Sequence, residues 1–180
     1  MGRRAVLPEH SDCLQLDCVQ SNVMNKVTEQ ASGSLLHLDE QLCFALYAAS
    51  RAMTAAYRPL LEPLDLTYPQ YLVLLVLWEV EACNVRELGE RLQLDSGTLT
   101  PLLKRMQAAG LVTRRRLRSD ARVVEIRITQ AGRALHARAL EIPACLIRHS
   151  GLSAQNLTEL RGSLTRLTGS LSSPPEGAIR

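Results

Sequence analysis

Aromatic residues and long apolar runs are both scarce in this sequence. The 180 residues include only one phenylalanine, one tryptophan and four tyrosines. No apolar run approaches the ~20 residues that a membrane-spanning helix requires, and the N-terminal apolar stretch Ala5-Val6-Leu7 ends at Pro8. That stretch is too short for the core of a secretory signal peptide. These absences argue against a membrane span and against secretion, so we expect a cytoplasmic protein with no membrane partner.

The five cysteines lack the spacing of a metal site. Cys13 and Cys18 are separated by four residues, but no second pair of cysteine or histidine residues would complete a tetrahedral zinc site. A disulfide framework is not expected in a cytoplasmic chain. We therefore predict no metal and no cofactor. The roles of Cys13 and Cys18 stay open, because translation from Met24 instead of Met1 would remove both.

Basic residues are concentrated in one short stretch, although the whole chain carries a formal net charge of only +3. Residues 111–128 contain six arginines against two acidic residues, a local net charge of +4. These arginines are Arg114, Arg115, Arg116, Arg118, Arg122 and Arg127. A local basic patch is typical of a surface that binds a polyanion such as nucleic acid. The alternative is a solvated arginine-rich hairpin.

Apolar periodicity predicts one mainly helical domain, residues 35–171, between a disordered arm at residues 1–34 and a disordered tail at residues 172–180. Leucine and alanine recur every three or four residues along the first predicted helix, residues 36–61. A second helix begins at Tyr68 and is almost wholly apolar. We therefore expect this second helix to be buried on most sides.

Two short helices and a hairpin follow, which is the order of a winged helix-turn-helix over residues 68–128. The short helices are predicted at residues 84–93 and 96–109. Their expected caps are Asn84, Asp95 and, after the second helix, Gly110. Segments rich in valine and isoleucine then predict a two-stranded wing. Its strands are expected at residues 111–117 and 122–128, around a tip at Arg118-Ser119-Asp120.

Leucines at spacings of three and four residues predict a helix–helix contact near the C-terminus. A long helix is expected at residues 129–148, interrupted near Pro143, and a last helix at residues 153–171. The seam of this last helix is Leu157, Leu160, Leu164, Leu167 and Leu171. We predict a homodimer in which residues 35–64 and 129–171 form the dimerisation region. The alternative is packing of the seam within one chain.

A cysteine on the first predicted helix shares its face with two of the four tyrosines. Tyr47 follows Cys43 by four residues and Tyr57 follows it by fourteen, which places the phenols about 40° to either side of the thiol. A phenol O–H can donate to a sulfur anion and stabilise it, and this anion is the nucleophilic form of cysteine. The spacing indicates a site that reacts with an oxidant. The alternative is a cysteine that only fills the core.

Three segments resemble the OhrR branch of the MarR family, a group of bacterial repressors that sense organic hydroperoxides. They are Leu42-Cys43-Phe44-Ala45-Leu46-Tyr47, Leu66-Thr67-Tyr68-Pro69-Gln70-Tyr71 and Leu94-Asp95-Ser96-Gly97-Thr98-Leu99-Thr100-Pro101-Leu102-Leu103. The resemblance covers residues 35–171. It implies a mainly α fold, a MarR-type winged helix-turn-helix with a two-stranded wing and with N- and C-terminal dimerisation helices. It also implies a homodimer that binds double-stranded DNA at a pseudo-palindromic operator.

The resemblance assigns a redox role to the thiol. Cys43 matches the cysteine that reacts with peroxide in this branch. Tyr57 and Tyr68 match phenols that hold its thiolate, reaching it from the other subunit. Tyr47 matches a third phenol near the same pocket.

A second thiol is implied in some members, on the helix that follows the wing, where it resolves the oxidised cysteine. Cys145 lies in that region, whereas the usual position falls nearer Arg148, one helical turn later. The alternative is capping of the oxidised cysteine by a low-molecular-weight thiol, with Cys145 in the core. Cys83, before the helix-turn-helix, is expected to be structural.

The resemblance also implies that the second short helix enters the major groove of DNA. Asp120 and Arg122 match a wing pair whose arginine enters the minor groove, and Leu117 stands where the family usually has an acidic residue. The expected DNA contacts are Ser96, Thr98, Thr100 and Lys104 on the helix, and Arg114, Arg115, Arg116, Asp120 and Arg122 on the wing. Thr98 and Thr100 are equally candidates for helix caps.

These observations predict a DNA-binding repressor, and not an enzyme, that releases its operator when an organic hydroperoxide oxidises Cys43. An apolar pocket lined by Leu42, Phe44 and Leu46 would favour organic peroxides, because burial of alkyl groups is favourable. One alternative is a MarR-type repressor that responds to a small aromatic ligand, with Cys43 buried. A second is a thiol peroxidase, although no signature of the peroxidase folds surrounds Cys43.

Overall fold

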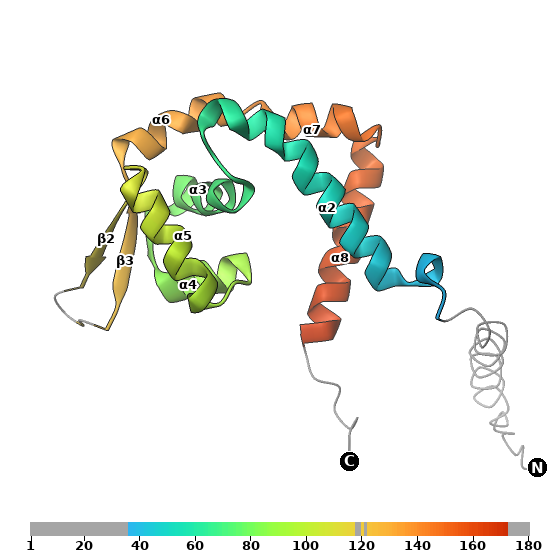
Figure 1. Cartoon of the computed structure of the whole chain (residues 1–180), viewed down its shortest axis with the longest axis horizontal. Coiled ribbons are helices and arrows are strands. Elements are labelled where there is room, and N and C mark those ends of the chain that lie inside the picture. The colour runs from blue at the N-terminus through green and yellow to red at the C-terminus, as the bar shows by residue number, and fades with distance from the viewer. Residues whose placement is uncertain (1–35, 118–119, 121, 173–180) are drawn as a thin grey trace, which may run out of the picture. The chain divides into compact units, whose positions relative to one another are not determined.

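The computed structural model describes residues 36–117, 120 and 122–172 (Figure 1). The chain is mainly helical, as predicted, with one small antiparallel sheet. The predicted arm at residues 1–34 lies outside the described residues. The predicted tail lies outside them as well, except for Ser172, which is the final residue of a helix and not the first residue of a tail.

The chain divides into two compact units after Ala52. Helix α2 (Leu42–Leu61) begins in the first unit and ends in the second. The first unit, Met1–Ala52, contains the 3-10 helix η1 (Leu38–Glu40) and the start of α2. The first helix therefore begins later than predicted. Gln41 has extended backbone dihedral angles (φ −81°, ψ 113°) and separates η1 from α2.

The second unit, Met53–Arg180, contains the predicted helix-turn-helix. The short 3-10 helix η2 (Glu62–Leu64) connects α2 to α3 (Tyr68–Val80). The two short helices that follow are α4 (Val85–Leu92) and α5 (Ser96–Ala108). The apolar helix α3 lies in the core, as predicted, and buries Tyr71, Val73, Leu74, Val76 and Leu77.

Local caps determine where the two short helices begin and end. Asn84 Oδ1 accepts the backbone N–H of Glu87 at 2.8 Å, and Asp95 Oδ1 accepts that of Thr98 at 2.9 Å. Both predicted N-caps are therefore confirmed. Gly110 follows α5 with a φ of +72°, a conformation that glycine adopts without steric cost. Its predicted role at the end of the helix is also confirmed.

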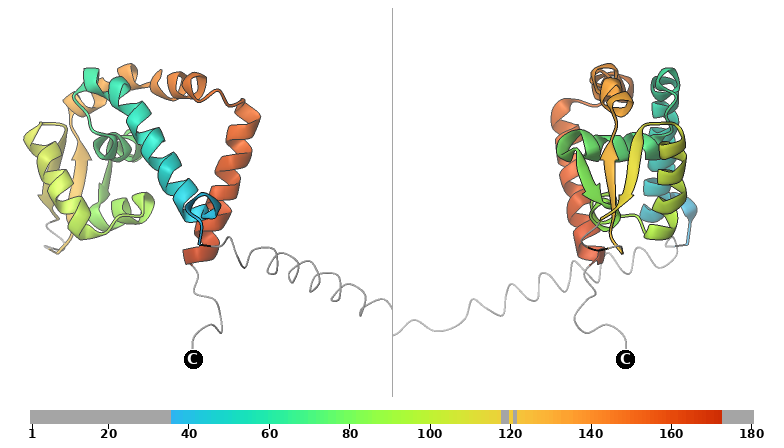
Figure 2. Two further views of the ribbon diagram at one scale, coloured as in Figure 1. Left: turned by 45° about the vertical axis from the view of Figure 1, so that its right-hand side comes forward. Right: turned by 90° about the vertical axis from the view of Figure 1, so that its left-hand side faces the viewer.

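The wing consists of β2 (Val112–Arg116) and β3 (Val124–Ile128), which pair antiparallel with Arg114 opposite Ile126. A third strand, β1 (Ala82–Asn84), pairs with the other edge of β3, so the strand order is β1-β3-β2 (Figure 2). The prediction of two strands was therefore incomplete. Three residues are too few to show the alternation of a strand, and β1 leads directly into the N-cap of α4.

The predicted helix at residues 129–148 is in fact two helices, α6 (Gln130–Ala139) and α7 (Ile142–Ser150). Pro143 lies in the first turn of α7, where its missing N–H costs no hydrogen bond, so the break precedes the proline. The last helix, α8 (Ala154–Ser172), contains no buried residue. The predicted leucine seam of α8 is therefore still available to a second copy of the chain.

The core of the second unit joins the helix-turn-helix to the sheet. Leu88 of α4, Leu99 of α5 and Ile126 of β3 have no exposed surface. Removal of such side chains from water is the main favourable contribution to folding. Within the described part of the chain, no single helix is long and apolar enough to cross a membrane, and only the bent pair Leu42–Leu64 and Tyr68–Val80 meets those criteria together.

Candidate functional site

The first turns of α5 carry the hydroxyl groups predicted to contact DNA. Thr98 Oγ1 donates to Asp95 Oδ2 at 2.8 Å, and Thr100 Oγ1 donates to the carbonyl oxygen of Ser96 at 2.7 Å. The backbone and side-chain hydrogen bonds from Thr98 lower the pKa of Asp95, so the capping carboxylate stays ionised. Thr98 thus belongs to the cap of α5, whereas the side chains of Ser96 and Lys104 are exposed.

A recess of about 760 Å³ opens between the helix-turn-helix and the wing. Four of the predicted DNA contacts line it: Ser96, Thr100, Arg114 and Arg122. Arg86 of α4 lines the same recess and was not predicted, because it lies outside both α5 and the wing. The structure thus brings hydroxyl and guanidinium groups from three elements to one concave surface.

Two arginines of the wing strands have contrasting surroundings. Arg127 on β3 forms an ion pair with Glu125, with 3.2 Å between Nη2 and Oε2. Arg114 on β2 is half-buried, and its Nε is buried with no hydrogen-bond partner among the described residues. An unsatisfied buried donor costs about 1–3 kcal/mol. Arg114 also lines the recess, where its positive charge attracts an anion.

The tip of the wing is shaped by a backbone contact. The Arg122 N–H donates to Asp120 Oδ1 at 2.9 Å, so the predicted Asp120 and Arg122 pair meets through the backbone. The guanidinium of Arg122 is consequently not occupied by that contact. Arg115 and Arg116 lie exposed on β2. Arg118, at the predicted tip, is outside the described residues.

Cys43 lies on the first turn of α2, and its side chain is exposed. One turn later, the Tyr47 hydroxyl accepts a hydrogen bond from Arg51 Nη1 at 2.8 Å, and the guanidinium lies 5.5 Å from the ring centre. Arg51 was not predicted, although its spacing of four residues from Tyr47 was the available signal. Leu42, predicted to line an apolar pocket, is 61% exposed in the single chain.

Tyr57 and Tyr68, predicted to act together, are in contact within the second unit. Their ring centres are 4.7 Å apart, and that of Tyr71 lies 5.8 Å from Tyr57. Burial raises the pKa of all three phenols, and the neighbouring phenols raise that of Tyr57 further. These hydroxyls therefore stay protonated at neutral pH and can donate to an anion. Tyr71 was missed, although it lies three residues after Tyr68 on the same helix.

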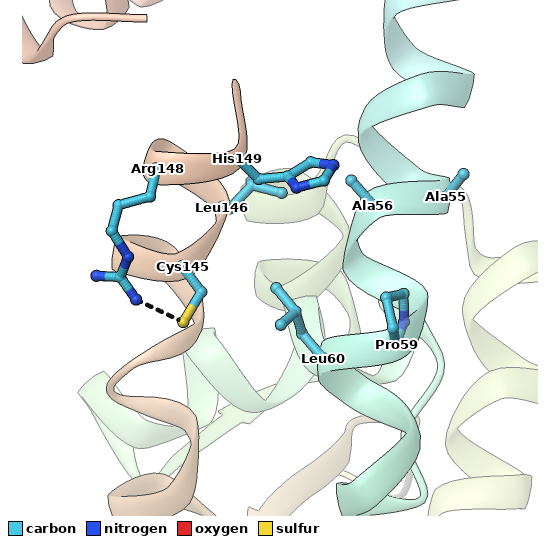
Figure 3. Close-up of a pocket in the computed structure, with 8 residues that line it drawn as sticks. All are labelled: Ala55, Ala56, Pro59, Leu60, Cys145, Leu146, Arg148 and His149. Carbon is cyan, nitrogen blue, oxygen red and sulfur yellow. Dashed lines mark hydrogen bonds between the residues drawn. The ribbon is translucent and has the colours of Figure 1, made fainter. Parts of the chain in front are cut away.

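Cys145 lies in a groove of about 650 Å³ between α7 and the last turns of α2 (Figure 3). Arg148 Nη2 donates to Cys145 Sγ at 3.0 Å, so a cationic group contacts the sulfur atom. The remaining lining residues are Ala55, Ala56, Pro59, Leu60, Leu146 and His149.

Cys83 is the remaining cysteine that the structure describes. Cys83 on β1 is half-buried, and burial raises the pKa of its thiol, which agrees with a structural role. Cys13 and Cys18 lie outside the described residues. In the ranges that the structure covers, no group of three or more histidine, cysteine, aspartate or glutamate side chains is placed to hold a metal ion.

The raised pKa values of the buried tyrosines predict a loss of stability at alkaline pH. A phenol whose folded-state pKa exceeds its unfolded-state value stabilises the protein fully below about pH 10, and this contribution is lost as the pH rises through the folded-state pKa. Above about pH 10, the free energy of unfolding in urea should fall more steeply for the wild type than for Tyr57→Phe. Equal profiles for the wild type and Tyr57→Phe would contradict this prediction.

Comparison with known proteins gives matches over most of the chain. The model of the MarR family matches residues 66–124. The organic hydroperoxide resistance transcriptional regulator of Bacillus subtilis (strain 168) is 49% identical over 136 residues, which are 76% of this chain and 92% of that protein. Reduced AbfR bound to DNA is similar in structure, with a TM-score of 0.66 and 33% identity over 78% of this chain and 99% of that chain.

AbfR has also been solved in a disulfide-formed state, which is similar to this chain with a TM-score of 0.55. That likeness has 35% identity and covers 82% of this chain and 98% of the other. The segment matched by the family model contains α4, α5, β2 and the residues that line the recess, and it ends at the first residue of β3. The chain therefore belongs to the MarR family of winged-helix transcriptional regulators, and within it to the OhrR branch.

Proposed function

We propose that this regulator is a repressor that senses organic hydroperoxides through Cys43 and releases its operator on oxidation. The observation that carries the proposal is the contact between the half-buried Tyr57 and Tyr68, whose hydroxyls stay protonated and match the thiolate-holding phenols of the OhrR branch. The exposed thiol of Cys43 matches the reactive cysteine of that branch. The 49% identical relative from Bacillus subtilis, named for organic hydroperoxide resistance, supports this function.

The length of α2 supports donation of the phenols from one subunit to the thiolate of the other. Cys43 and Tyr57 are fourteen residues apart on this helix, about 21 Å at a rise of about 1.5 Å per residue. Such a separation is far beyond hydrogen-bond reach. Cys43 therefore receives the Tyr57 and Tyr68 hydroxyls from a second copy of the chain. A homodimer, with α8 contributing its uncovered leucine seam, is thus part of the proposal.

The chemistry begins with the Cys43 thiolate, stabilised by donation from the two phenols. The sulfur attacks the O–O bond of the hydroperoxide, forming an S–O bond as the O–O bond breaks. Cys43 becomes a sulfenic acid, and the departing alkoxide takes a proton to become an alcohol. A second thiol then forms a disulfide with Cys43, and the sulfenic hydroxyl leaves as water.

Cys145 is the proposed second thiol, and a low-molecular-weight thiol is the alternative. Cys145 opens to the groove between α2 and α7, and Arg148 donates to its sulfur. A disulfide-formed state is known for AbfR, 35% identical to this chain, and this supports a disulfide route. With the alternative route, Cys43 carries the small thiol and Cys145 stays reduced.

Operator binding depends on the recess between α5 and the wing. A DNA phosphate there would pair with the positive charges of Arg114 and Arg122, which line the recess. The start of α5 would enter the major groove, and Arg122 the adjacent minor groove. The structure of reduced AbfR bound to DNA, 33% identical to this chain, supports this surface as the DNA interface.

Release follows from a difference between the reduced and oxidised dimers. Oxidation removes the thiolate that the phenols bind, and a disulfide adds a covalent restraint on the dimerisation helices. Rotation of the two winged parts would then change the separation of the recognition helices. Half-sites on DNA are spaced by a fixed number of helical turns, so a changed separation lowers the affinity.

A second candidate function is repression controlled by a small aromatic ligand. The groove between α2 and α7 favours it, because apolar side chains such as Leu60 and Leu146 share the lining with Arg148 and His149. Such a lining suits a ligand with an aromatic body and an acidic group. In that case Cys43 would have no part in the response.

Replacement of Cys43 by serine distinguishes the two candidates. The reduced wild type should bind operator and lose affinity after one equivalent of an organic hydroperoxide, whereas Cys43→Ser should stay bound, as measured by fluorescence anisotropy. Cys145→Ser is the matched control, because it keeps the first oxidation step. Intact mass then identifies an internal disulfide or an added small thiol. If wild type and Cys43→Ser both stay bound, the redox proposal fails and the ligand-controlled repressor becomes the leading candidate.

Replacement of Arg122 by alanine tests the wing. Arg122→Ala should weaken operator binding, because the side chain that enters the minor groove is lost from both subunits of the dimer. Arg127→Ala is the matched control, since the Arg127 guanidinium is already paired with Glu125. Sedimentation should show an intact dimer for both variants. Unchanged operator affinity in Arg122→Ala would refute its role.

A further inference from the structure

Five aromatic side chains form a continuous series of contacts through the second unit. The ring centres are 4.7 Å apart for Tyr68 and Tyr57, and 5.8 Å for Tyr57 and Tyr71. The series continues with 6.2 Å from Tyr71 to Trp78 and 5.2 Å from Trp78 to His136. Tyr71 and Trp78 are seven residues apart on α3, about two turns, and so share one face. The chain has only six phenylalanine, tryptophan and tyrosine residues, and four are in this series.

Trp78 follows the three tyrosines in this series and makes two directional contacts with α6. Its indole Nε1 donates to the carbonyl oxygen of Gly132 at 3.0 Å. The His136 ring, one turn further along α6, meets the indole edge to face with an interplanar angle of 76°. The indole is half-buried, and a hydrogen bond in such surroundings is stronger than one in water. The position of the indole and the position of the first turn of α6 therefore depend on each other.

Gly132 joins this turn of α6 to the base of the wing. A Cβ atom added there would lie 2.5 Å from the carbonyl oxygen of Leu111 and 2.8 Å from Ile128 Cγ1. The Thr129 N–H donates to the same carbonyl of Leu111 at 3.1 Å, and the Thr129 hydroxyl accepts the Gly132 N–H at 3.1 Å. Packing this close leaves no room for independent movement, so the start of α6 and the base of the wing move together.

We propose that Trp78 is a positioning residue that couples the phenol pair, Tyr57 and Tyr68, to the wing through Gly132. The inference rests on the proposed redox function. When the sensor thiolate is oxidised, the two phenols lose their acceptor and repack, and Tyr71 and Trp78 shift because they pack in series with them. The hydrogen bond from Trp78 to Gly132 transmits this shift to the base of the wing, and the DNA-binding arginines change position.

Coupling of this kind is measured by a ratio of affinities. A residue that only supports the fold changes the operator affinity of the reduced and oxidised proteins alike, and so leaves their ratio unchanged. A residue that couples the two sites changes the ratio. The oxidised-to-reduced ratio of operator dissociation constants is therefore the readout that separates positioning by Trp78 from simple structural support.

The test is Trp78→Phe, which keeps an aromatic ring in the core and removes the N–H donor to Gly132. The variant should bind operator in the reduced state and should be oxidised at Cys43, as shown by intact mass. The oxidised-to-reduced ratio of its operator dissociation constants should be at least about fivefold smaller than that of the wild type. Val73→Ala is the matched control, because Val73 is fully buried on α3 but is outside the aromatic series.

The outcomes separate the inference from the function on which it rests. If Trp78→Phe has the same oxidised-to-reduced ratio of operator dissociation constants as the wild type, the coupling role is overturned and the redox function stands. An equal decrease of this ratio in Val73→Ala also overturns the coupling role, because the effect would then follow from general destabilisation. If the wild type itself does not release operator, the redox function fails and the coupling role fails with it.

A measurement on the unaltered protein tests the same inference. Trp78 is the single tryptophan of the sequence, so tryptophan emission reports on its surroundings alone. One equivalent of an organic hydroperoxide should shift the emission of the wild type and leave that of Cys43→Ser unchanged. Unchanged emission in a wild type whose oxidation is shown by intact mass would overturn the inference, even where Trp78→Phe does not fold.

Discussion

Tyr57 at the end of α2 packs its ring against Tyr68 and Tyr71 at the start of α3, and this contact connects the long N-terminal helix to the core of the DNA-binding part. Burial there raises the pKa of each phenol, so the hydroxyls remain donors at the pH of a cell. A protonated phenol can hold a thiolate and loses that partner when the sulfur is oxidised. In the proposed mechanism a change at the sulfur would reach the body of the winged helix, because the same rings pack towards Trp78.

The arginines differ in whether they are paired with an acidic side chain, and this difference shapes the proposed DNA-binding surface. Arg133 pairs with Glu81, and Arg127 pairs with Glu125, so these cations are engaged within the scaffold. Exposed ion pairs contribute little to stability. Arg114 and Arg122 instead line the recess beside α5, where Arg114 keeps a buried donor unsatisfied. The charge available to a polyanion is therefore concentrated where the recognition helix meets the wing.

The helix-turn-helix could be predicted because its determinants are local. Asn84 and Asp95 each cap a helix through a residue three positions away, and Gly110 needs only its own backbone freedom. β1 could not be predicted, since its strand character comes from β3, which lies some forty residues later. The contact from Trp78 to Gly132 spans 54 residues and leaves no pattern in the sequence. For the candidate site, the sequence singled out Cys43 and the tyrosines Tyr57 and Tyr68, which the structure brings into contact with each other. It did not reveal the arginines that contact Tyr47 and Cys145.

In the proposed mechanism the phenols of one subunit donate to the Cys43 thiolate of the other, and the alkylation rate of Cys43 by iodoacetamide at neutral pH tests this step most directly. The homodimer carrying both Tyr57→Phe and Tyr68→Phe should react more slowly than the wild type. A heterodimer of that subunit with a Cys43→Ser subunit retains one Cys43, which faces the intact phenols of its partner. The one Cys43 of this heterodimer should be alkylated at the wild-type rate. A rate as slow as that of the doubly substituted homodimer would contradict pairing between subunits.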